Sequence, residues 1–158
     1  MKQVDMKEVD TRILRSLQAD SSGSIAELAE RVGLSTSACH RRVRQLEEAG
    51  LIERYVARLG REALGLALEV FVEISLHSQS EESLEAFEAA VTSSPEILEC
   101  HLMAGQADFL LRVAARSVDH FDQIHRKTLA KLPGVSSMHS SFVLRSTKTW
   151  QGYPVEVS

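Results

Sequence analysis

The side chains best suited to chemistry lie in a basic, hydroxyl-rich stretch at residues 35–46. On a helix its apolar members would fall on one face and its polar members on the other, with Arg42 towards the flank. Arginine can pair bidentately with guanine, while Ser and Thr hydroxyls bond to phosphates or base edges. We therefore predict that this polar face, with one arginine beyond it, binds double-stranded DNA through Ser35, Thr36, Ser37, His40, Arg41, Arg42, Arg44 and Arg54.

The residues ahead of this stretch predict the element that positions it. Ser24 and Glu27 are spaced as a capping box before an apolar run of helical period. Gly33 stands where a helix end needs a left-handed residue, and Ser35 can cap the next helix. Two short helices joined by a tight turn, the second with a basic face, are typical of a helix-turn-helix.

An arginine-rich helix face is also common on proteins that bind no nucleic acid, so the spacing alone leaves two interpretations open. The run Glu53–Leu59 has a strand-like pattern and follows a glycine stop at Gly50. Such a strand suits a wing that lies over the DNA backbone, and it favours the DNA-binding interpretation.

A third helix is expected before the pair, at about residues 6–19, where Val9, Ile13 and Leu17 recur at helical spacing. Asp5 and Glu8 could form its N-terminal capping pair. We thus place a winged helix-turn-helix domain at residues 1–62, a unit too small to hold a large core.

Composition and charge narrow the function further. Of the 158 residues 44% are hydrophobic, with no signal-peptide core and no apolar stretch near the ~20 residues of a membrane span. We expect a cytoplasmic protein with no membrane partner. The net charge of −4 is unevenly spread, because residues 1–60 carry 10 Lys/Arg and 9 Asp/Glu, whereas residues 61–158 carry 8 and 13. Positive charge focused on one helix matters more for phosphate contact than the total.

Cysteine and histidine give no sign of a metal site. Cys39 and Cys100 are far apart in apolar stripes, so we expect them to be reduced and buried. The six histidines are scattered, and no nucleophile–base pair or phosphate loop has a recognisable spacing. We therefore expect neither a cofactor nor an enzyme.

After Gly65 the hydrophobic period changes from helical to alternating, which predicts a half-buried strand at residues 66–76. We expect a helix ending near Pro95, then a hairpin at 97–115, and then a helix from 117 with Val118 on its inner side. The last element should be a strand at 135–148 with Met138, Ser140, Phe142 and Leu144 on one face. This β-α-β-β-α-β order is the ferredoxin-like arrangement, so the chain is α+β with a second domain at residues 63–158. Phe71 lies on the sheet face that the helices leave uncovered, and such a face invites a second subunit.

The whole chain resembles the Lrp/AsnC family of bacterial and archaeal transcription regulators. The order and spacing of its motifs make the match specific. They are Asp10-Thr11-Arg12-Ile13-Leu14, Ala26-Glu27-Leu28-Ala29, Val32-Gly33-Leu34-Ser35, Arg41-Arg42-Val43-Arg44-Gln45-Leu46-Glu47, Gly50-Leu51-Ile52, Gly105-Gln106-Ala107-Asp108-Phe109 and Leu132-Pro133-Gly134-Val135.

By this resemblance the first domain binds DNA, and the second binds an effector and forms homodimers that assemble further, often to octamers. The implied effector is an amino acid or a related metabolite, held between the second domains of neighbouring dimers. The implied site residues are Gly105, Gln106, Ala107 and Asp108 of the hairpin turn, with Ser140 and Ser141 of the last strand. The chain departs from the family pattern at Lys7, where an Asp is frequent, and at Gln106, where an acidic residue is frequent.

Alternatives stay open at this point. Gly105 and Asp108 also suit a plain hairpin turn, although N–H groups at a glycine turn can hold a carboxylate and an aspartate can accept from an ammonium. The chain would be a metabolite-sensing ferredoxin-like module without DNA-binding activity if Arg41 and Arg44 were only solvated surface. Trp150 and Tyr153 are expected to be packing or interface anchors rather than effector contacts.

Overall fold

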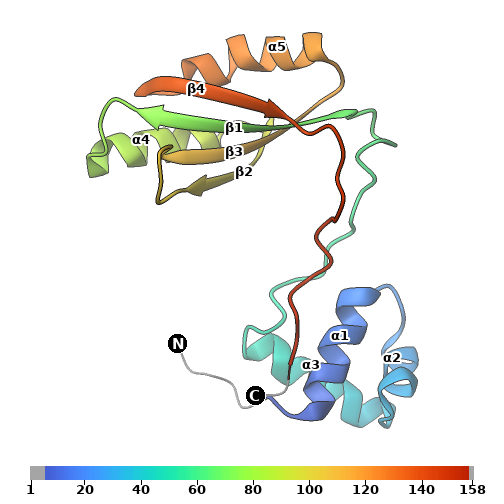
Figure 1. Cartoon of the computed structure of the whole chain (residues 1–158). Coiled ribbons are helices and arrows are strands. Elements are labelled where there is room, and N and C mark those ends of the chain that lie inside the picture. Colours follow the sequence, from blue (N-terminus) through green and yellow to red (C-terminus); the bar gives the residue numbers. More distant parts are fainter. Residues whose placement is uncertain (1–5, 157–158) are drawn as a thin grey trace. The chain divides into compact units, whose positions relative to one another are not determined.

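The computed structural model describes residues 6–156 and divides them into two compact units. One unit contains the described residues up to Arg58 together with the tail from Lys148 onward, and the other is Leu59–Thr147. The sequence-based domain boundary assigned the tail to the second domain, whereas the structure packs the tail with the first unit (Figure 1).

Three helices form the first unit: α1 (Glu8–Ala19), α2 (Ile25–Val32) and α3 (Thr36–Glu48). Each contributes one apolar stripe to a shared small core, in which Ile13, Leu28 and Cys39 are buried. Helices of this length are marginal alone in water, so this packing is what keeps them folded.

The predicted caps of α2 and α3 are confirmed. The hydroxyl of Ser24 accepts from the N–H of Glu27, whose carboxylate accepts in return from the N–H of Ser24. Gly33 ends α2 with a φ of 68°, in the left-handed region that favours glycine. Ser35 then accepts from the N–H of Ala38, so α3 starts directly after the turn.

The first helix begins at Glu8, two residues after the start predicted near residue 6. Its cap is made within the first turn, where Oδ2 of Asp10 accepts from the N–H of Lys7 at 2.8 Å. Asp5, expected to pair with Glu8, lies outside the described residues.

The strand expected at Glu53–Leu59 is not formed. Residues 53–60 pair with no strand in the described part of the chain, and a strand requires a hydrogen-bonded neighbour. A side chain holds this segment instead, because the hydroxyl of Tyr55 donates to Glu47 of α3 at 2.9 Å. Burial and this hydrogen bond raise the pKa of Tyr55 to about 12.

An antiparallel sheet in the order β2-β3-β1-β4 forms the second unit, with β1 at Leu68–Leu76, β2 at Ile97–Leu102, β3 at Phe109–Ala115 and β4 at Val135–Phe142. Helices α4 (Glu81–Thr92) and α5 (Val118–Lys127), and the short 3-10 turn Leu129–Lys131, pack on one face (Figure 1). Alternate residues of β1 and β3 supply the buried row beneath them, which includes Val72 and Leu111. The predicted ferredoxin-like order and its core are confirmed.

The other face of the sheet has no helix over it among residues 6–156. Phe71 and Leu110 lie half-buried near its centre. Beside them, Arg112 donates to both Glu69 and Glu99. Burial alone would lower the pKa of Arg112, but the hydrogen bonds to these carboxylates raise it, so the guanidinium stays charged.

Two details of the second unit differ from expectation. Strand β4 ends at Phe142 rather than at Lys148, and Leu144, expected within the strand, is 98% exposed because it lies beyond the pairing with β1. Val118 is 63% exposed because it opens α5, ahead of the turn that reaches the core through Phe121.

The cysteines, the length of the helices and the grouping of possible metal ligands can be compared with the expectations from the sequence. Cys39 and Cys100 are both free, the first buried and the second half-buried, and burial raises the pKa of each thiol. No helix in residues 6–156 is both long and apolar enough to cross a membrane. In the same part of the chain, no group of His, Cys, Asp or Glu side chains has a metal-binding arrangement.

A buried ion pair joins α1 to α3. The side chain of Asp10 is 1% exposed, and its two oxygens accept from Nε and Nη2 of Arg42. These hydrogen bonds lower the pKa of Asp10 below its ordinary value, although burial alone would raise it. Gln45 accepts from the remaining Arg42 nitrogen, Nη1, at 2.9 Å.

We predict that Arg42→Ala destabilises the first unit by about 3–5 kcal/mol, because it leaves the Asp10 carboxylate buried and unpaired. Arg41→Ala is the matched control, since the neighbouring side chain is exposed, and should change stability by less than about 0.5 kcal/mol. Urea unfolding followed by circular dichroism measures both. Equal stability of the two variants at neutral pH would contradict the role given to Arg42.

The ion pair also predicts a dependence on pH. Because the folded-state pKa of Asp10 is lowered, its contribution to stability is fully present above the unfolded pKa of about 3.9 and is lost as the pH falls through the folded pKa. The stability difference between wild type and Asp10→Asn should therefore stay constant above about pH 5 and shrink at lower pH. A difference that does not change with pH would show that the ionised pair contributes nothing, and one that grows on acidification would show that the ionised carboxylate is unfavourable in the folded state.

Candidate DNA-binding surface and effector site

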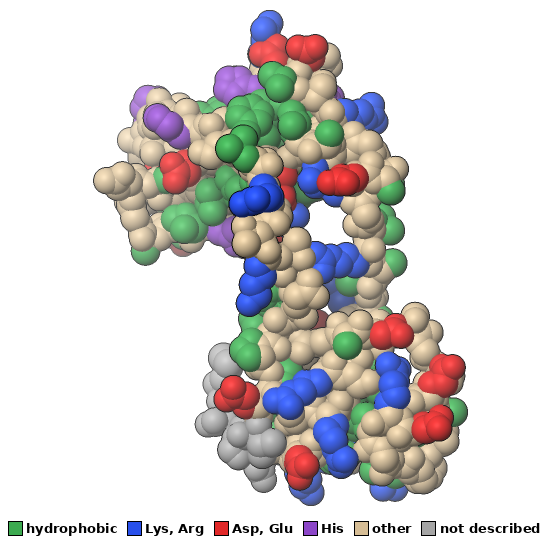
Figure 2. All heavy atoms as spheres, turned by 45° about the vertical axis from the view of Figure 1, so that its right-hand side comes forward, with side chains coloured by type: hydrophobic (Ala, Val, Ile, Leu, Met, Phe, Trp, Pro, Cys, Tyr) green, Lys and Arg blue, Asp and Glu red, His purple; other side chains and the backbone are tan. Residues whose placement is uncertain are grey.

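The outward face of α3 presents exposed side chains that the core does not use: Thr36, Ser37, His40, Arg41 and Arg44. Arg44 lies 3.8 Å from Glu48, one turn along the surface, a contact too weak to prevent exchange for a phosphate. Figure 2 shows acidic side chains (red) among the basic ones (blue) on the helical unit. The visible surface of this unit is therefore mixed in charge rather than uniformly basic.

The other predicted DNA contacts differ from this set. The guanidinium of Arg42 is engaged by Asp10 and Gln45, and the hydroxyl of Ser35 caps α3. Arg54 is exposed in the extended segment after α3. All three stay predictions as DNA ligands, but Arg42 and Ser35 already have roles in the fold.

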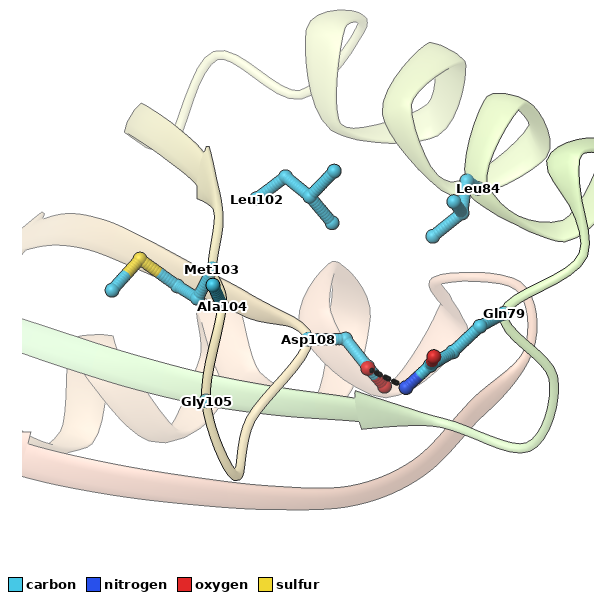
Figure 3. Close-up of a pocket in the computed structure, with 7 residues that line it drawn as sticks. All are labelled: Gln79, Leu84, Leu102, Met103, Ala104, Gly105 and Asp108. Atoms are coloured by element: carbon cyan, nitrogen blue, oxygen red, sulfur yellow. Dashed lines mark hydrogen bonds between the residues drawn. The ribbon is translucent and has the colours of Figure 1, made fainter.

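A hollow of about 330 Å³ lies beside the turn between β2 and β3. Leu84 of α4 and Leu102 of β2 face each other across it, and Gln79 and Asp108 close one side through a hydrogen bond (Figure 3). The hollow is open, since Leu102 is 59% exposed. Its full lining is Gln79, Leu84, Leu102, Met103, Ala104, Gly105 and Asp108.

Asp108 anchors the base of the turn. It is 9% exposed, and its oxygens accept from the N–H of Leu76 at 2.7 Å and from Nε2 of Gln79 at 2.6 Å. Its own N–H donates to the carbonyl of Ile74, and its carbonyl accepts from the N–H of Met103. The carboxylate predicted to accept from an effector ammonium therefore first ties the hairpin to the end of β1.

The tip of the turn is free by contrast. The N–H groups of residues 104–107 have no intramolecular acceptor within the described part of the chain. Gly105 does not have a positive φ, and a Cβ built on it would meet nothing within 4 Å. Neither the backbone conformation nor the packing of this chain requires glycine at this position, so the open space is available to something outside the chain.

The remaining predicted effector residues are not gathered at the hollow. Gln106 and Ala107 belong to the turn between β2 and β3 but do not line the hollow. Ser140 and Ser141 lie on β4 opposite Val72 and Phe71, on alternate faces of the sheet and two strands away from β3. Within one chain the structure does not bring them to the turn.

The sequence predicted only Gly105 and Asp108 of the seven residues that line the hollow. Leu84 has the spacing of a core residue, and only its place at the start of α4 brings it to the rim. Gln79 lies in a polar turn that could equally be solvated, and Met103 follows directly after β2. The one available signal was the pair of large apolar residues, Leu102 and Met103, next to a polar turn.

Comparison with known families matches both units. Residues 6–53 match the family model of a winged helix-turn-helix DNA-binding domain, and residues 69–152 match that of the Lrp/AsnC ligand binding domain. The chain belongs to the Lrp/AsnC family. The strand of a wing is nevertheless absent from residues 53–60 of this chain.

Individual relatives agree with this assignment over nearly the full length. The leucine-responsive regulatory protein of Salmonella typhimurium is 40% identical over 144 residues, which are 91% of this chain and 88% of that protein. The Bkd operon transcriptional regulator of Pseudomonas aeruginosa is 39% identical over 142 residues, 90% of this chain and 93% of the relative.

Solved structures show the same fold. A transcriptional regulator of Neisseria meningitidis in complex with L-Met has a TM-score of 0.89 at 36% identity, covering 94% of this chain and 96% of the other. An AsnC family regulator of Agrobacterium tumefaciens has a TM-score of 0.88 at 37% identity, covering 94% and 97%.

This Lrp/AsnC protein is accordingly a DNA-binding transcriptional regulator with a ligand-binding second domain. The DNA-binding interpretation that the sequence had left open is confirmed. The relatives are transcriptional regulators.

We predict that Arg41→Ala and Arg44→Ala each weaken operator binding by about 1–3 kcal/mol if the side chain contacts bases. An arginine that contacts only phosphate would weaken all sequences alike and reduce the salt slope by about one. Arg12→Ala, an exposed arginine on α1, is the matched control. Mobility shifts on operator and unrelated duplexes measure these effects, and unchanged binding after loss of both arginines would rule out this face.

Proposed function

We propose that this regulator senses an amino acid with an apolar side chain, bound in the hollow beside Gly105. The observation that carries the proposal is the presence of exposed apolar walls and unpaired loop N–H groups in one open hollow. Burying a leucine- or methionine-sized side chain against such walls contributes about 1.5–3 kcal/mol. The apolar walls of the hollow can thus bind the side chain of such an amino acid.

The polar end of the ligand needs donors for its carboxylate and acceptors for its ammonium. The N–H groups at the tip of the turn supply the donors, as backbone nests do for anions. Gln79 uses its NH₂ group on Asp108, which leaves its carbonyl oxygen facing the site as an acceptor, and Asp108 retains lone pairs beyond its two hydrogen bonds. Both requirements are met within a few residues of Gly105.

The relatives support this ligand class. One structural neighbour is a complex with L-Met, and one group of relatives is named leucine-responsive. Both amino acids have unbranched or γ-branched apolar side chains of the size that Leu84, Leu102 and Met103 can contact. The proposed ligand class therefore follows from the walls of this hollow and agrees with those names.

On the DNA side, the proposed contacts are the exposed residues of α3 with Arg54 of the following segment. The protein acts as a homodimer, and dimers assemble further. The half-buried Phe71 and Leu110 on the uncovered sheet face support a dimer through that face, and the open hollow supports a second subunit that covers the effector. Paired recognition helices then require operators with two half-sites about one helical turn apart, or multiples of it.

We predict that Gly105→Leu lowers effector affinity by about 10- to 100-fold, because the new side chain occupies the hollow without straining the fold. Its melting temperature should match that of wild type. Calorimetric titration with L-leucine and with L-methionine measures the affinity.

Gly60→Leu is the matched control, since that glycine also lacks a positive φ and its added Cβ meets only Ala63 at 3.6 Å. It should bind the amino acid as wild type does. Wild-type binding by Gly105→Leu, or no binding of either amino acid by the wild type, would refute the proposed site or ligand class respectively.

We predict that light scattering at micromolar concentration gives a mass at least twice the 17.5 kDa of one chain. Phe71→Lys should reduce that mass to a single chain, because it replaces an apolar side chain of the proposed interface with a charged one that must lose its water on association. Val118→Lys, on the helical side and already 63% exposed, should leave the mass unchanged. A wild-type monomer would contradict the proposed assembly.

A further inference from the structure

The C-terminal tail lies along α1 and is bound there by side chains of that helix. Arg15 donates to the carbonyl of Val155 through Nε at 3.0 Å and through Nη2 at 2.7 Å. Gln18, one turn further along, donates to the carbonyl of Tyr153 at 3.0 Å. We call residues 148–156 the C-terminal strap.

Val155 is the apolar anchor of the strap. It is half-buried and packs against the hydrophobic core shared by the three helices. A core as small as this one gains a larger fraction of stability from each added apolar contact than a full-sized domain would. The docked strap therefore stabilises the folded state of the DNA-binding unit.

Gly152 shows that the fit is specific. Its φ is +103°, and an added Cβ would lie 2.6 Å from Cδ of Gln18. A residue with a side chain rarely adopts this φ, so the docked backbone favours glycine here even though the end of the Gln18 side chain could move. Pro154, two residues further on, restricts the strap before docking, which lowers the entropy lost on binding.

The helix that receives the strap also holds the recognition helix. Asp10 of α1 carries the ion pair to Arg42 of α3, on the same helix as Arg15 and Gln18. The strap is in turn continuous with β4 of the ligand-binding unit, from which residues 143–147 separate it. The contacts of the strap are exposed hydrogen bonds and one half-buried side chain, which are typical of elements that open locally at low cost.

We propose that the Arg15–Gln18 surface of α1 is a docking site for the chain's own C-terminal strap, and that the docked strap is a reversible latch that keeps α1 ordered and so holds the recognition helix. When the latch opens, α1 loses its bonds to the strap and the cover of Val155. The amides of α1 then lose protection against hydrogen exchange. Helix α3 shifts its position, while its own internal structure stays the same.

Trp150 gives a direct readout, because it is the chain's only tryptophan and lies in the strap, with its ring 4.7 Å from that of Tyr153. The test uses the full chain with Gly152→Val, which blocks docking, and Arg15→Ala/Gln18→Ala, which removes the donors on α1. Gln151→Ala is the matched control, since the Gln151 side chain bonds only to Thr149. Each protein is measured by time-resolved anisotropy of Trp150 and by hydrogen exchange of the α1 amides.

In wild type and Gln151→Ala, Trp150 should rotate with the protein and the α1 amides should be protected. In both docking variants, Trp150 should gain a fast nanosecond component and the α1 amides should exchange about tenfold faster. Unchanged α1 exchange in both docking variants, or a Trp150 as mobile in wild type as in those variants, would overturn the latch. If Gly152→Val fails to fold, the α1 double variant decides alone.

Discussion

The arrangement of the DNA-binding unit depends on one buried ion pair, between Asp10 and Arg42. Helix α3 is only 13 residues long and buries no more than Cys39, Val43 and Leu46, so apolar contact alone fixes its rotation weakly. The planar guanidinium of Arg42, bound through two nitrogens, specifies the orientation of α3 against α1. Arg41, the next residue, is left to solvent. The two adjacent arginines thus have different roles: Arg42 fixes the orientation of α3, and Arg41 is exposed and accessible to a ligand such as DNA.

In the ligand-binding unit, the turn between β2 and β3 likewise has a part that is fixed by the fold and a part that is free. Asp108 fixes the base of the turn to β1 through hydrogen bonds, and the buried rows of β1 and β3 fix the strands. The tip, with Gly105 and the free N–H groups, needs no contact within the chain. A rigid base under an unsatisfied tip would make the proposed effector site preorganised, since a ligand bound there would lose little free energy in ordering the loop. Asp108 is therefore a poor position at which to test ligand contact, because its loss would disturb the base as well.

Local patterns predicted the elements of both units, but not the contacts between residues distant in sequence. The alternation in β1 and the caps at Ser24 and Gly33 depend only on neighbours, and they were predicted correctly. From the sequence alone, Arg42 and Arg41 are both polar side chains near the surface of α3. Their roles differ because Asp10, 32 residues earlier, accepts from Arg42. The alternating pattern also continued to Leu144, although β1 no longer pairs with that segment. The strap carries no periodic pattern at all, so its docking on α1 could not be predicted from the sequence.

Charge limits how the two units can communicate. The second part of the chain, residues 61–158, carries 8 basic and 13 acidic residues, so its net charge disfavours contact with DNA. An amino acid with an apolar side chain is a zwitterion of zero net charge, so its binding leaves that field nearly unchanged. It can alter DNA affinity only if it binds two arrangements of the protein unequally. The relevant difference must then lie in geometry, either in the spacing of recognition helices within an assembly or in their hold on the rest of the chain. A sensor of neutral zwitterions therefore acts on DNA binding through a change in protein conformation rather than through the charge of its ligand.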